Sequence, residues 1–102
     1  MTAQGNGKPI VWRVSQLGPV KQALRDHFHR AQLAGIGKEF LAAVEHIYER
    51  LRKNPHGFGE PKFNLPAMQM LVQVAIHRPL VVTFGIHKAE PLVVIRNVTY
   101  LD

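Results

Sequence analysis

Apolar and polar residues recur along the chain with two different periods, and the change of period predicts where strands and helices lie. Residues 9–15 alternate, with Ile10, Trp12 and Val14 on one side, which is typical of a half-buried strand. Gly18-Pro19 interrupts this segment, and proline favours the first turn of a helix. We therefore expect a strand over residues 9–15, followed directly by a helix.

Apolar residues then repeat every three to four positions, which predicts two consecutive amphipathic helices. In residues 20–35 one face carries Val20, Leu24, Phe28 and Ala31, and another carries Lys21, Arg25, His29 and Gln32. In residues 38–54 the apolar stripe contains Phe40, Leu41, Val44, Ile47, Tyr48 and Leu51. Gly35 and Gly37 bracket Ile36, so the link is short and the helices should form an antiparallel hairpin.

The second half of the chain returns to a period of two. Residues 55–66 are dense in proline and glycine and predict a loop, and strands are expected at 68–78, 80–88 and 92–101. Runs this close together form an antiparallel meander. The predicted fold is therefore α+β with the order β-α-α-β-β-β, an antiparallel four-stranded sheet and a helical hairpin packed on one face.

The opposite face of this sheet is expected to be partly open, because one side of the strands carries Gln, Thr and His. The length suits a single domain over residues 9–102, preceded by a flexible tail at residues 1–8.

Charge and composition narrow the possible partners. Thirteen Lys and Arg against seven Asp and Glu give a net charge of +6, which favours an anionic partner, either nucleic acid or an acidic protein. A merely soluble basic protein is the alternative reading. The chain has no cysteine, which excludes disulfides and thiolate chemistry. No apolar run is long enough to span a bilayer and no leader is visible, so we expect a cytoplasmic protein without membrane contact.

The order and spacing of these elements, over about residues 10–101, resemble those of the RelE/ParE toxin family. "FLAAVEHIYERLRKNPHGFGEPKFNL" is similar to the long family helix that closes on Leu-x-x-Asn-Pro before a Gly-x-Pro loop, and "LVVTFGIHKAEPLVVIRNV" is similar to the last hairpin. Within the family the chain most resembles the plasmid-stabilisation, ParE-type members. The resemblance implies the toxin of a type II toxin–antitoxin module, held inactive by an acidic antitoxin. ParE-like members poison DNA gyrase, whereas RelE-like members cut messenger RNA on the ribosome.

RNA cleavage without a metal needs a proton acceptor, a proton donor and a fixed cation near the phosphate. The candidate catalytic residues are Arg96, Tyr100 and His87, and the candidate residues for binding nucleic acid or a partner are His77, Arg78, Lys88, Lys21 and Arg25. A meander that turns near residue 79 makes His77 face about Val82 and His87 face about Val72, which separates the two histidines by about 17 Å.

A second turn near residues 89–90 makes Arg96 face Thr83, and a spacing of four places Arg96 and Tyr100 on one face of the strand. The penultimate strand reads "LVVTFG" and has no arginine, which active RNA-cutting members of the family usually carry there. We therefore expect a toxin that binds gyrase or the translation machinery. The alternatives are a ribosome-dependent RNA endonuclease and a non-toxic binding domain derived from a toxin.

No cofactor or metal site is predicted. His27 and His29 lie two positions apart on a helix, about 200° around its axis, so they cannot both hold one ion.

Overall fold

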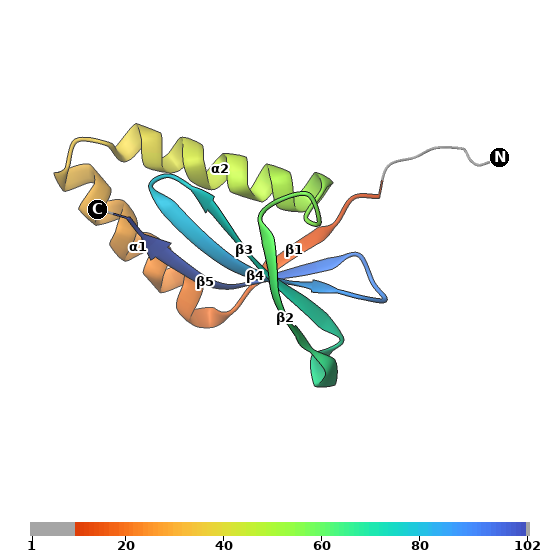
Figure 1. Cartoon of the computed structure of the whole chain (residues 1–102). Helices are drawn as coiled ribbons and strands as arrows, with labels where there is room; N and C mark the ends of the chain where they lie inside the picture. The colour runs from red at the N-terminus through yellow and green to blue at the C-terminus, as the bar shows by residue number, and fades with distance from the viewer. Residues whose placement is uncertain (1–9, 102) are drawn as a thin grey trace.

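The computed structural model describes residues 10–101, and the predicted tail at residues 1–8 lies outside them. Two helices and five strands follow one another in an α+β arrangement (Figure 1). The elements are β1 (Arg13–Gln16), α1 (Gly18–Leu33), α2 (Gly37–Lys53), β2 (Glu60–Leu65), a short 3-10 turn (Pro66–Met68), β3 (Met70–His77), β4 (Leu80–His87) and β5 (Leu92–Tyr100). No helix within this part of the chain is long and apolar enough to cross a membrane.

The sheet has five strands and is mixed, so the predicted four-stranded antiparallel sheet is correct only in part. Its order is β1-β5-β4-β3-β2. β3, β4 and β5 form the expected antiparallel meander, and β2 extends it by one antiparallel strand that was not expected. β1 instead pairs in parallel with β5, through Arg13–Gln16. The direction of β1 was unpredictable, because no tight turn joins it to the strand beside it.

The additional strand, β2, arises in the segment that the Pro and Gly content predicted to be a loop. β2 is an edge strand, nearly all of its residues are exposed, and its pairing with β3 shifts between Pro61 and Phe63. A proline lacks the backbone N–H that a central strand needs, but an edge strand with a bulge accommodates it. The prediction failed because only the position at the edge of the sheet makes this sequence compatible with a strand.

The two helices pack as a hairpin on one face of the sheet, as predicted (Figure 1). The link is tight because Gly35 adopts a positive φ of 80°, which costs glycine nothing, and the Ile36 N–H then donates to the Ala31 carbonyl. The buried residues of α2 are Phe40, Ala43, Ile47 and Leu51. Leu41, which the sequence assigned to the same stripe, is 54% exposed.

The core lies between this hairpin and the strands in the middle of the sheet. In β4 the predicted alternation is confirmed, since Leu80, Val82, Phe84 and Ile86 are all buried in the core. Removing each large apolar side chain from water contributes about 1.5–3 kcal/mol, so this row contributes substantially to the stability of the fold.

Candidate functional site

The face of the sheet that turns away from the helices is a candidate interaction surface. Phe63 on β2 and Ile76 on β3 are 52% and 65% exposed, which is unusual for large apolar side chains on paired strands. Ile76 pairs with Val81, whose strand neighbours Leu80 and Val82 point into the core, so Ile76 and Val81 lie on the opposite side. We call this side the open face.

The side of β3 that faces the helices is the one that the sequence predicts to face solvent. Gln73 was expected on the open side, but it is 2% exposed and its amide donates to the carbonyl oxygens of Pro55 and Phe58 at 3.2 and 3.1 Å. His77 also faces the helices and stacks on His46 of α2. The more apolar row of β3, which ends at Ile76, therefore lines the open face, where Val72 is covered and Ile76 is not.

Charge distinguishes the sheet from the helices. β1, β3, β4 and β5 contain no aspartate or glutamate, and β2 contributes a carboxylate only at Glu60. Arg13 and Arg96 are the arginines of these strands. A partner that carries carboxylates therefore meets little like charge across the open face.

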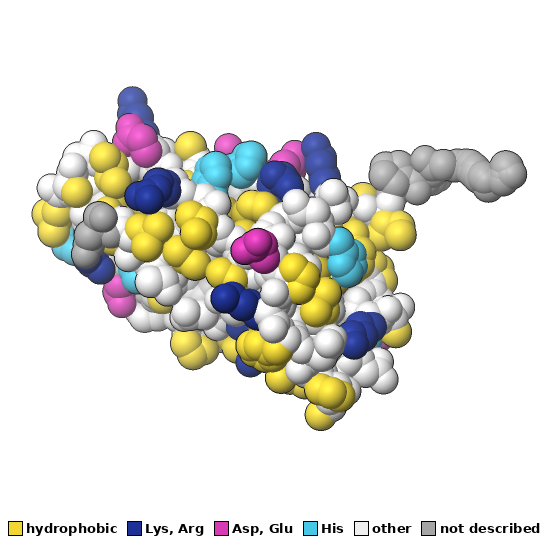
Figure 2. Space-filling model, viewed as in Figure 1, with side chains coloured by type: hydrophobic (Ala, Val, Ile, Leu, Met, Phe, Trp, Pro, Cys, Tyr) yellow, Lys and Arg dark blue, Asp and Glu magenta, His cyan; other side chains and the backbone are white. Residues whose placement is uncertain are grey.

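The candidate basic residues do not converge. In the view of Figure 2 the Lys and Arg side chains are separated by hydrophobic ones and form no continuous basic patch. Lys21 and Arg25 are exposed on α1, and Arg78 is exposed at the turn between β3 and β4.

His77, at the end of β3, belongs to a small cluster beside the middle of α2. Its ring stacks on that of His46, with the ring centroids 4.3 Å apart and the planes 18° from parallel. Burial lowers the pKa of His77, and the nearby charges of His46 and Arg50 lower it further. A histidine in this setting stays neutral, so it supplies no fixed cation for a phosphate.

His87 and Lys88 lie at the other end of β4, where the chain turns toward β5. His87 faces Met70, and His77 faces Leu80 rather than Val82, so the predicted pairing of these strands was displaced by two residues. Nδ1 of His87 accepts hydrogen bonds from the backbone N–H groups of Ala89 and Glu90 at 3.1 and 3.0 Å. In the neutral ring the proton is therefore on Nε2, and His87 offers a hydrogen-bond donor and no free base.

The predicted position of Arg96 opposite Thr83 is wrong, because β5 contains a bulge. The register shifts between Thr83 and Phe84, so Asn97 faces Thr83 and Arg96 becomes the extra residue. Tyr100 packs on the helix side, stacked on the ring of His27 and beneath the guanidinium of Arg30 at 4.8 Å.

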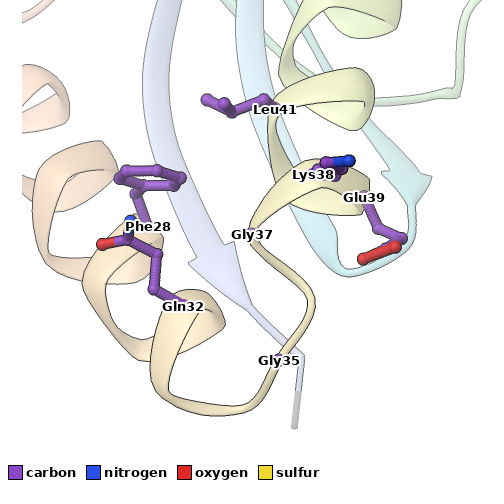
Figure 3. Close-up of a pocket in the computed structure, with 7 residues that line it drawn as sticks. All are labelled: Phe28, Gln32, Gly35, Gly37, Lys38, Glu39 and Leu41. Carbon is purple, nitrogen blue, oxygen red and sulfur yellow. The ribbon is translucent and has the colours of Figure 1, made fainter.

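The described residues offer no ready site for a metal ion. Among residues 10–101 no group of three or more His, Asp or Glu side chains is placed to hold a metal ion. An open hollow of about 520 Å³ lies at the turn between the helices, where Figure 3 shows Phe28, Gln32 and Leu41 directed toward the gap and Lys38 and Glu39 directed away from it. The groups that point into this hollow are an amide and apolar carbons, which do not perform proton transfer.

The sequence did not single out Ile76 and Phe63 as functional candidates. The only sequence signal for Ile76 was the apolar alternation of residues 68–76, which is equally typical of a core strand. Comparisons with protein-family models, with curated proteins and with solved structures find no match for this chain.

Proposed function

We propose that the chain is the toxin component of a type II toxin–antitoxin module of the RelE/ParE kind, and that it acts by binding. In this proposal an acidic antitoxin lies across the open face of the sheet. The observation that carries it is the combination of exposed Ile76 and Phe63 with strands that are almost free of carboxylates. Apolar anchors on strands that carry few carboxylates suit a partner with an apolar stripe and acidic flanks.

Binding is favoured over RNA cleavage by the separation of the candidate catalytic residues. Tyr100 is packed against α1, Arg96 lies in the bulge of β5, and His87 is held at the distant turn by two backbone N–H groups. Concerted acid–base chemistry needs its groups within hydrogen-bond reach of one phosphate.

The parallel pairing of β1 is a departure from the sheet that the sequence led us to expect. The proposal therefore relies on the helical hairpin, the antiparallel meander and the open face, and takes no support from β1.

Expression of the chain alone and together with the short acidic protein expected from the adjacent gene tests this function. We expect growth arrest in the first case and rescue in the second, with both proteins eluting together in size-exclusion chromatography. Arrest with an SOS response and intact transcripts identifies gyrase as the target, and inhibited translation with intact transcripts identifies the translation machinery. Cleaved transcripts contradict action by binding, and the absence of arrest contradicts a toxin.

A matched pair of variants locates the antitoxin. Ile76→Asp places a charge on the open face and should weaken the complex at least about tenfold, equivalent to about 1.4 kcal/mol. Leu33→Asp makes the same kind of change at the end of α1, where Leu33 is 77% exposed, and should leave the complex unchanged. Equal affinities for both variants would place the antitoxin elsewhere.

A further inference from the structure

A second hollow, of about 470 Å³, lies at the end of the sheet where β1 begins and β4 turns into β5. Its chemically active lining residues are Trp12, His56, His87, Lys88 and Glu90. The volume is within the range of small-molecule sites, and such sites combine apolar walls with a few polar groups. The sequence identified His87 and Lys88 as candidates, but Trp12 and His56 join them only through the fold.

Backbone hydrogen bonds fix the walls of this hollow. The Trp12 N–H donates to the carbonyl of Arg52 at the end of α2, and the Arg13 N–H donates to that of Pro91 at 2.8 Å. The rings of Trp12 and His56 meet edge to face, with centroids 5.6 Å apart and planes 75° from parallel. A flat ligand that stacks on one of these rings therefore meets the edge of the other.

The polar groups of the hollow are mostly donors. Because Nδ1 of His87 already accepts two backbone N–H groups, the neutral ring turns a donor, Nε2–H, toward other acceptors. Within residues 10–101 Lys88 forms no ion pair, so its ammonium is available to an anion. The Glu90 carboxylate supplies an acceptor at the same rim.

We propose that this hollow binds a planar heteroaromatic ring that carries a phosphate group, as in a nucleoside monophosphate. The ring stacks on Trp12, an amino group of the ring donates to Glu90, and the phosphate accepts from Lys88 and the histidines. Stacking of a base on an aromatic side chain stabilises the complexes of proteins that bind single strands, and a charge-assisted hydrogen bond adds to this stabilisation. The proposal is independent of the toxin–antitoxin function, because it concerns a different part of the molecule.

The purified chain carries its own reporter, since Trp12 is the only tryptophan in the sequence. AMP, added with excitation at 295 nm to avoid absorption by the base, should quench Trp12 fluorescence saturably, with a dissociation constant of about 1 mM or lower. Adenosine should bind more weakly because it lacks the phosphate, and ribose 5-phosphate should bind more weakly because it lacks the ring.

Two lysine variants separate this site from general attraction to a basic protein. Lys88→Gln should weaken AMP binding about tenfold and leave adenosine binding unchanged. Lys38→Gln makes the same charge change at the start of α2 and should affect neither ligand. Equal AMP affinities in the two variants would overturn the proposal, as would quenching without saturation or equal affinity for AMP and ribose 5-phosphate.

Competition with a single-stranded RNA hexamer identifies the source of the nucleotide. Displacement of AMP by the hexamer at much lower concentrations than AMP itself requires assigns the hollow to a nucleotide within RNA. Displacement only at concentrations similar to that of AMP, or not at all, assigns it to a free nucleotide. Both results support a nucleotide site.

Discussion

The loop after α2 depends on the buried polar side chain of Gln73. Replacing Gln73 should therefore destabilise the protein more than replacing an exposed glutamine would. Its amide donates to the carbonyl oxygens of both Pro55 and Phe58, and Phe58 in turn stacks on Phe84 of the core with ring centroids 6.0 Å apart. Gln73→Leu has a similar size but no donor, so the Phe58 carbonyl loses this hydrogen bond.

The magnitude follows from three contributions. Two neutral hydrogen bonds contribute about 1 kcal/mol each, and a buried carbonyl without a partner costs about 1–3 kcal/mol. The leucine recovers about 1–2 kcal/mol through apolar burial. The expected net loss is therefore about 2 kcal/mol, which lowers the melting temperature of a domain of this size by about 8–16 °C.

Thermal and urea denaturation, followed by circular dichroism, measures this loss. Gln32→Leu is the matched control, because Gln32 is exposed on α1, and its melting temperature should change little. If Gln73→Leu melts within 2–3 °C (about 0.5 kcal/mol) of the original chain, the hydrogen bonds do not hold the loop and the reasoning is refuted.

Three further predictions test the packing and the titrating groups. Gly59→Ala should lower the unfolding free energy by more than about 2 kcal/mol, because Gly59 has a φ of 88° and a Cβ there would lie 2.3 Å from the Val74 carbonyl oxygen. The control is Gly37→Ala, whose Cβ would meet the Gln32 side chain at 3.2 Å and whose unfolding free energy should stay within about 1 kcal/mol of the original. Because the pKa of His77 is lowered in the folded protein, the unfolded chain binds the proton more tightly. The stability that neutral His77 contributes is therefore present above pH 6.5 and is lost as the pH falls through the folded pKa. Melting temperatures between pH 8 and 5 should vary less in His77→Gln, and equal pH profiles would contradict this. Burial raises the pKa of Tyr48, so absorbance titration at 295 nm should show a tyrosine that ionises above pH 10 and disappears in Tyr48→Phe.

The helices and the core row of β4 were predictable because their patterns are local. The short link that contains Gly35 is enough to predict the helical hairpin. The alternation that begins with Leu80 and Val81 is enough to predict which side of β4 faces the core. Each of these inferences needs only a few consecutive residues.

The sides of β3 were not predictable, because they depend on a segment far away in the sequence. Gln73 is tolerated in the core only because Pro55 and Phe58 present carbonyl oxygens to it. Without that loop, polarity alone places Gln73 in solvent and Ile76 in the core, the reverse of what is found.

The predicted positions of the candidate site residues depended on strand registers that were predicted incorrectly. A single extra residue at Arg96 separated this arginine from the strand position expected for it, and no local signal marks the bulge. The hollow that contains Trp12 was missed for a related reason, since it forms only when β1 joins β5 in parallel.

The parallel pair has a consequence for how the protein is made. β1 is synthesised before β5 and finds its partner only when β5, the last strand of the described chain, has followed it. A contact between such distant segments slows folding, and a chain halted before residue 92 exposes the unpaired edge of β4 with its apolar row. Chains halted at this stage are therefore substrates for chaperones and proteases, and the hollow beside Trp12 forms only after β5 has joined β1.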